Sequence, residues 1–228
     1  MPEQKIIVDA ILFDMDGTLI DSTPGVLKAW ELFCKDYSLG DSETIAHETH
    51  GRRLYDTLKE YCKIDEEEKL HASAEIDRFE DEVILGGPVA LPGTLELLNR
   101  LIQLNANWTI ATSASNKYTP GALNKAGLPI PKIGYVTSND VSKGKPFPDP
   151  YLAGALKCGV DAKNCLVVED AVSGLTAGRA AGAKVLAVCT STPKERLLAG
   201  AQPDFIVPDL RSISVSAVGN KIEVTISE

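Results

Sequence analysis

Short runs of apolar and β-branched residues alternate with amphipathic stretches along most of the chain. Each run is apolar throughout and too short for a helix, which is typical of strands buried on both faces of a parallel sheet. Parallel strands need a crossover between them, and the amphipathic stretches predict helices in those places. The sequence therefore predicts an α/β fold with a helix-flanked parallel sheet. Its strands are expected at residues 8–14, 107–113, 133–136, 164–170 and 184–188.

The interval between the first two predicted strands breaks this rhythm, because about 90 residues pass without a convincing strand. Apolar residues recur there at helical spacing and predict three helices. The first carries Val26, Trp30, Phe33 and Tyr37, the second carries Leu54, Leu58 and Cys62, and the third begins at Asp65. Gly86-Gly87-Pro88 is typical of a linker that returns the chain to the sheet. We therefore expect an all-helical insertion at residues 23–87 within a core formed by residues 1–22 and 88–228.

The C-terminal segment alternates apolar and polar residues on both sides of Gly219-Asn220. A two-residue turn of this composition predicts an exposed β-hairpin. Its edge could pair with another strand or simply be covered, so the oligomeric state is open. We expect a monomer.

Composition narrows the possible partners. The chain has 228 residues, 44% of them apolar, and a net charge of −9, so it can bury a core but lacks the positive field that attracts nucleic acid. No stretch reaches the ~18 apolar residues that a membrane span requires. The five cysteines are far apart, without a Cys-x-x-Cys pair, which is typical of reduced thiols. We expect a cytoplasmic protein with no nucleic-acid or membrane partner.

Two carboxylates, Asp14 and Asp16, stand where the first predicted strand ends. In an open parallel sheet, ligands bind outside the carboxyl ends of the strands. Side chains two residues apart on a strand share a face, so these two charges would lie close together unless a cation neutralises them. Asp-x-Asp-Gly also occurs in ordinary turns, so this segment alone leaves a purely structural role open.

The ends of other strands place further polar groups at the same edge. Ser113 offers a hydroxyl near backbone amides before a helix, a pattern that suits an anion but is also common in helix capping. Lys145 stands between Gly144 and Pro146, which restrict its loop. Glu169-Asp170 ends an apolar strand, where desolvating carboxylates is costly. Together these residues predict an active site that binds a cation and a phosphate.

This set of motifs, in this order, resembles the haloacid dehalogenase superfamily of phosphatases over the whole chain. Asp14-Met15-Asp16-Gly17-Thr18 is similar to its first motif, Ser113 to its second, Lys145 to its third and Glu169-Asp170 to its fourth. Residues 23–87 resemble the helical cap of the family, and the resemblance implies a Rossmann-like core. Residues 49–53, 144–152 and 169–182 are similar to segments of the fungal glycerol-phosphate and 2-deoxyglucose-6-phosphate phosphatases.

The resemblance implies hydrolysis of small sugar or polyol phosphate monoesters through an aspartyl-phosphate. Asp14 would be the nucleophile and Asp16 the general acid and base. Mg²⁺ would be bound by Asp14, the Asp16 backbone carbonyl and Asp170, with Glu169 behind them or acting through water.

Phosphate oxygens would be held by Lys145, Ser113 and backbone amides around Met15 and Ala114, which makes Lys145 a catalytic residue as well. From the cap, His50 and Arg53 are the residues expected to face the substrate.

Two rival functions are open. The β-phosphoglucomutases share all four motifs, but they carry an arginine where this chain has Leu54, one residue after Arg53, and a histidine where it has Val26. Both differences favour a phosphatase. The other rival is a phosphate-binding or scaffold protein that has lost catalysis, although none of Asp14, Asp16, Lys145 and Asp170 is missing.

Overall fold

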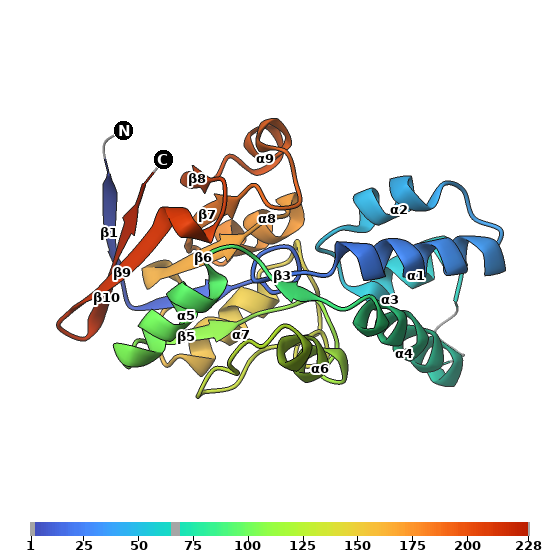
Figure 1. Cartoon of the computed structure of the whole chain (residues 1–228), viewed down its shortest axis with the longest axis horizontal. Helices are drawn as coiled ribbons and strands as arrows, with labels where there is room; N and C mark the ends of the chain where they lie inside the picture. The colour runs from blue at the N-terminus through green and yellow to red at the C-terminus, as the bar shows by residue number, and fades with distance from the viewer. Residues whose placement is uncertain (1–2, 65–68, 228) are drawn as a thin grey trace.

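The computed structural model describes residues 3–64 and 69–227 of the chain. Figure 1 shows a sheet flanked by helices and, at one end of the molecule, a separate group of four helices. The central strands are β2 (Ala10–Phe13), β5 (Trp108–Ile110), β6 (Cys165–Glu169), β7 (Lys184–Val188) and β8 (Phe205–Val207). They are parallel throughout, in the order β5-β2-β6-β7-β8. The predicted α/β class is confirmed.

Helices cover both faces of this sheet. They are α5 (Thr94–Gln103), α6 (Tyr118–Lys125), α7 (Asp149–Lys157), α8 (Val172–Ala180) and α9 (Lys194–Ala201), with 3₁₀ turns at Ala162–Asn164 and Leu210–Ser212. Successive side chains of a strand point to opposite faces, so β2 contributes to two apolar cores. Ile11 and Phe13 belong to one core, and Ala10 and Leu12 to the other.

Among the described residues, four helices lie between β3 (Ile20–Asp21) and β4 (Val89–Ala90), and we call them the cap helices. They are α1 (Thr23–Asp36), α2 (Ser42–Thr49), α3 (Leu54–Cys62) and α4 (Lys69–Leu85). The chain leaves the core through β3 and returns through β4, which pair antiparallel. The expected all-helical insertion is confirmed. Its limits as a separate domain, residues 23–87 within 1–22 and 88–228, stay a prediction.

The cap helices have an aromatic core of their own. Trp30 and Phe33 of α1 are buried against Phe79 of α4, with ring centroids 5.1 and 5.3 Å from that of Phe79 and the rings edge to face. Such pairs add to the free energy gained from area burial alone. The helical spacing in the sequence identified Trp30 and Phe33 correctly as buried residues.

Helix α2 is a cap helix that the sequence patterns did not predict. It has only eight residues, too few for a clear apolar period. Its start carries a local signal, because the Asp41 carboxylate accepts a hydrogen bond from the Thr44 amide at 2.8 Å. The predicted start of the third helix, at Asp65, lies outside the described residues.

Two of the predicted strands differ from the structure. Residues 133–136 were expected to form a strand, but only Val136 pairs, as an isolated bridge to Ala111. Gly134, within this segment, has φ +81°, which is outside the extended region and interrupts the strand. The first predicted strand is divided as well, because β1 (Gln4–Val8) ends before β2 and joins a different sheet.

The C-terminal hairpin supplies two of the three strands of that second sheet, whose order is β1-β10-β9. β9 (Ile213–Val218) and β10 (Lys221–Ile226) flank the predicted Gly219-Asn220 turn, and β1 pairs antiparallel with β10 as a third strand. The hairpin itself is confirmed. Its expected exposure is wrong for one face, because Val215 and Val224 are buried and β9 packs against α5.

Two exclusions drawn from composition can be compared with the structure. All five cysteines are free, with three of them buried and Cys158 and Cys189 partly exposed. Among the described residues, no helix combines the length and the apolar character that crossing a bilayer requires.

Candidate active site

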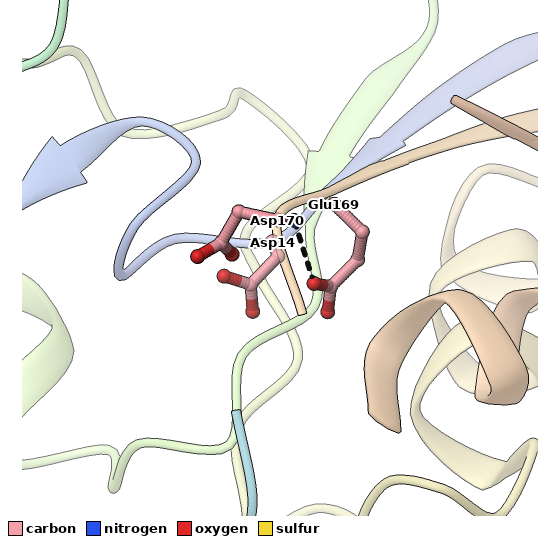
Figure 2. Close-up of side chains that lie close together, drawn as sticks. All are labelled: Asp14, Glu169 and Asp170. Atoms are coloured by element: carbon pink, nitrogen blue, oxygen red, sulfur yellow. Dashed lines mark hydrogen bonds between the residues drawn. The ribbon is translucent and has the colours of Figure 1, made fainter. Parts of the chain in front are cut away.

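Three buried carboxylates meet where β2 and β6 end side by side. Asp14 follows β2 directly, and its amide donates to the Val168 carbonyl of β6 at 3.0 Å. Glu169 ends β6 and Asp170 follows it, and carboxylate oxygens of all three residues lie within 4.8 Å of one another. In Figure 2 the Asp14 carboxylate lies between those of Asp170 and Glu169. The parallel pairing of two strands distant in sequence therefore builds the acidic cluster.

Lys145 pairs with two of these carboxylates. Its fully buried ammonium contacts the Asp14 carboxylate and lies 2.8 Å from Glu169 Oε1. Burial alone would lower the pKa of Lys145, but the two carboxylates outweigh it and raise that pKa above its ordinary value. Burial raises the pKa of Asp14 well above its usual range, although Lys145 opposes the change. One cation therefore serves several neighbouring carboxylates.

Glu169 is turned toward protein donors. Its Oε1 accepts from Lys145 and from the Tyr151 hydroxyl at 2.9 Å, and its Oε2 accepts from the Asp170 and Ala171 amides, each at 2.9 Å. Gly174 makes room for this carboxylate, because a Cβ there would lie 1.5 Å from Oε1. These contacts suit a residue that orients Lys145.

Asp170 connects the core to the cap. Its Oδ1 accepts from the Thr18 hydroxyl at 3.0 Å, while its Oδ2 lies 2.7 Å from His50 Nε2 and also contacts the Ser191 hydroxyl. Burial opposes protonation of His50, but Asp170 overcomes it and raises the pKa of His50 to about 9. His50 lies between α2 and α3, so the loop after α2 reaches the carboxylate cluster.

Asp16, two residues after Asp14, also lines the cavity between the cap helices and the core. Its Oδ1 accepts from the Ser22 hydroxyl at 2.6 Å and from the Tyr118 hydroxyl at 2.8 Å. Burial raises the pKa of Asp16, although both hydrogen bonds oppose the increase. A carboxyl whose protonated form is favoured in this way is suited to donating a proton.

Ser113 and its neighbours contact the loop between α2 and α3, residues 50–53, which we call the cap loop. The Ser113 hydroxyl donates to the Gly51 carbonyl at 3.0 Å, and the Ala114 amide donates to Thr112 Oγ1 at 3.1 Å. Gly51 has φ +75°, and a Cβ there would lie 2.6 Å from the Ala171 Cβ. The absence of a side chain at Gly51 allows the loop to approach the core closely.

Arg52 and Arg53, in the loop between α2 and α3, differ in position. Arg53, expected to face the substrate, donates to Asp56 at 2.7 and 3.0 Å and to the Ser142 carbonyl at 3.3 Å, and it is not among the cavity-lining residues. Arg52 does line the cavity, with its guanidinium 2.5 Å from Glu60. A contact between Arg53 and substrate stays a prediction.

A cavity of about 570 Å³ lies between the cap helices and the carboxyl end of the sheet. It brings together Asp14, Asp16, Ser113, Ala114 and His50 from the predicted set. Sequence reasoning missed several polar lining residues, namely Glu43, His47, Thr57 and Glu80 from the cap and Tyr118 and Ser191 from the core. The strand-end rule could have found Ser191, since it closely follows β7. The helical periodicity of the cap contains no signal for which polar residue faces the cavity.

All four motifs lie within the segment of the chain that matches a known protein family. A model of the haloacid dehalogenase-like hydrolases matches residues 8–182. The chain belongs to this family. Hexitol phosphatase A of Escherichia coli (strain K12) is 36% identical over 211 residues, which cover 92% of this chain and 94% of that protein. This hydrolase therefore shares nearly its full length with a phosphatase.

Two further likenesses concern the rival functions. Glycerol-1-phosphate phosphohydrolase 2 of Saccharomyces cerevisiae (strain ATCC 204508 / S288c) is 33% identical over 220 residues, covering 91% of this hydrolase and 85% of the yeast protein. The solved structure of a putative β-phosphoglucomutase from Bacteroides vulgatus superposes with a TM-score of 0.74 at 27% identity, covering 89% of this chain and 84% of that one. The resemblance to fungal phosphatases is confirmed.

Proposed function

We propose that this hydrolase is a metal-dependent phosphatase that releases phosphate from small sugar or polyol phosphate monoesters. The observation that carries the proposal is the placement of Asp14 beside Asp170, with Asp16 facing the same cap-covered cavity. A relative named for hexitol phosphates and another named for glycerol 1-phosphate support the substrate class.

The acidic cluster fits a hard divalent cation. Asp14 and Asp170 present buried carboxylate oxygens close together, and burial together with neighbouring negative charge raises the pKa of Asp14. Mg²⁺ prefers oxygen ligands of this kind. Asp14, Asp170 and the Asp16 backbone carbonyl would hold the ion, with Glu169 behind them. When bound, it would offset the repulsion between the Asp14 carboxylate and a substrate phosphate.

Asp14 is placed to attack phosphorus at the end of a rigid strand. A carboxylate oxygen forms a bond to phosphorus while the bond from phosphorus to the leaving oxygen breaks. Asp16 gives its proton to that oxygen, so an alcohol departs. In the second step Asp16 takes a proton from water, whose oxygen bonds to phosphorus and releases phosphate and the free Asp14 carboxylate.

Lys145 supplies the positive charge that holds the phosphate oxygens, and Glu169 keeps its ammonium in place. The Ser113 hydroxyl would exchange its bond to the Gly51 carbonyl for one to the phosphate. That exchange requires movement of the cap loop. Opening and closing of residues 23–87 over the core would admit water for the second step and exclude it from the first.

A phosphosugar mutase is the alternative, favoured by the likeness to the putative β-phosphoglucomutase. A mutase must grip a second phosphate while the first is transferred. Arg52 and Arg53 are poorly placed for this grip, because Arg52 is paired with Glu60 and Arg53 with Asp56. We therefore favour the phosphatase, acting as a cytoplasmic monomer.

A panel of phosphorylated metabolites, assayed for phosphate release with and without EDTA, tests the proposal. We expect glycerol 1-phosphate, hexitol phosphates and 2-deoxyglucose 6-phosphate to rank above nucleoside monophosphates, with all activity lost in EDTA. Conversion of β-glucose 1-phosphate to the 6-phosphate with little free phosphate would instead identify a mutase. No turnover of any monoester would favour the phosphate-binding protein without catalysis.

A further inference from the structure

Glu80 is a buried carboxylate that the two steps of phosphate release leave unused. It belongs to cap helix α4, has only 5% of its surface exposed and lines the same cavity as Asp14 and Asp16. Burial raises the pKa of Glu80 to about 7, and Asp16 contributes to the increase. Because keeping a carboxylate in such a place costs free energy, its position calls for a function.

The core holds Glu80 across the boundary with the cap. The Ser115 amide donates to Oε1 at 2.9 Å, and the Ser115 hydroxyl donates to Oε2. The same hydroxyl oxygen accepts from the Lys117 and Tyr118 amides at 3.2 and 3.1 Å, where α6 begins. Amides at a helix start are natural donors to an anion, and here Ser115 and Glu80 already engage them.

Positive charge near Glu80 is scarce. Among the described cavity-lining residues, Arg52 is the only lysine or arginine, and Glu60 pairs with it. His50, whose pKa is raised to about 9, also lines the cavity and pairs with Asp170. Lys117 is paired with Asp77 of α4 at 3.1 Å. A second phosphate in this part of the cavity would meet a carboxylate without a free counterion. A hydroxyl could instead donate to the lone pairs that Ser115 leaves open on Glu80.

We propose that Glu80 determines leaving-group selectivity, accepting hydrogen bonds from hydroxyls and repelling a second phosphate. The inference rests on the proposed function, since it takes the leaving group to occupy the cap side of the cavity. Glu80 faces the leaving group and not the attacked phosphorus. Its effect is therefore on the choice between substrates, whereas the chemical step belongs to Asp14 and Asp16.

The test compares D-glucitol 6-phosphate with D-glucitol 1,6-bisphosphate, which share a carbon skeleton. Wild type should have the higher kcat/KM for the monophosphate. Glu80→Gln keeps the size of the side chain and removes the charge, so the preference should fall by about tenfold or more. Glu82→Gln is the matched control, because it removes the same charge from α4 at a residue that pairs with Lys28 at 3.8 Å and does not line the cavity. Its preference should equal that of wild type.

Calorimetric dissociation constants for the same two ligands, measured in an Asp14→Asn background, give the preference without turnover. These measurements distinguish failure of the proposed function from failure of the role of Glu80. If the proposed substrate class is wrong, the wild type releases no phosphate from the monophosphate, but the ratio of the two dissociation constants can still be measured. An unchanged ratio in Glu80→Gln would overturn the role of Glu80. Equal weakening of both ligands would also overturn it, by showing a purely structural latch between cap and core. Glu80→Met, neutral and similar in volume, replaces the glutamine variant if that variant does not fold.

Discussion

The core wall and the cap wall of the cavity are built by different means. On the core wall, Asp14 and Asp170 are fixed by the register of adjacent parallel strands, with a buried ion pair from Lys145 to Asp14 and a part-buried contact from the cap residue His50 to Asp170. On the cap wall, polar side chains project from helices connected to the core through the short β3–β4 pair. Atoms that must be positioned for bond making lie on the rigid wall. Residues that would contact the variable part of a substrate lie on the wall that can move.

Replacing the proposed nucleophile, on the core wall, should reduce turnover more than any change on the cap wall. Asp14→Asn is isosteric and relieves charge repulsion with Asp170, so the fold should persist while turnover falls by about 10⁴-fold or more. Circular dichroism and steady-state phosphate release measure the two effects. Turnover near that of wild type in a folded variant would show that the covalent mechanism is wrong.

Removal of the general acid should have the next largest effect. Asp16→Ala should reduce kcat by ~10²–10⁴-fold, the usual contribution of acid–base assistance. Mg²⁺ should still bind, because Asp14, Asp170 and a backbone oxygen remain. Complete loss of Mg²⁺ binding in calorimetry would instead make the Asp16 side chain an essential ligand.

Disturbing Glu169 should have a smaller effect, because Glu169 acts through Lys145. Glu169→Gln should lower kcat/KM by roughly 10–100-fold, the usual cost of losing such a supporting contact. Gly174→Ala should act in the same direction, since its Cβ would collide with the Glu169 carboxylate. Gly40→Ala is the control, because a Cβ there would have no heavy atom within 4 Å. Full activity in Gly174→Ala would argue against the importance of this carboxylate's position.

The smallest expected effect concerns stability and lies on the cap wall. The pKa of Glu80 is raised from 4.5 to about 7, so the folded state holds its proton more tightly than the unfolded state. This stabilisation is complete below pH 4.5 and is lost as pH rises toward 7, by about 3 kcal/mol at most. The Glu80→Gln variant has no carboxyl group to titrate at this position, so it does not lose stability in this way. The free energy of unfolding of the variant minus that of wild type should therefore increase from pH 5 to pH 8. Urea unfolding at several pH values measures this, and a difference that does not change with pH would contradict it.

The chemistry of the core wall could be predicted from the sequence because its logic is local. Apolar runs mark strands, and the carboxyl ends of parallel strands share one edge of a sheet. That rule placed Asp14 beside Asp170 and assigned Ser113 to the same site. The identification of strands from apolar runs failed at residues 133–136, where the positive φ of Gly134 ends the extended backbone. It also missed β8, which has only three residues.

The cap wall depended on tertiary structure. Helical spacing correctly predicted that Trp30 is buried, because an apolar stripe must face some core. It did not identify Glu80 as a cavity residue, since its contact with Ser115 joins positions 35 apart and arises only when α4 packs beside α6. The contact of Arg53 with the Ser142 carbonyl likewise joins positions 89 apart and follows from how the loop after α2 meets the core. The sequence by itself determined which polar residues gather at the carboxyl edge of the sheet, because these residues directly follow short apolar runs that form adjacent parallel strands. The packing of helices distant in sequence decided which residues face the leaving group, because periodicity separates apolar from polar faces but does not distinguish a polar side chain facing solvent from one facing a cavity.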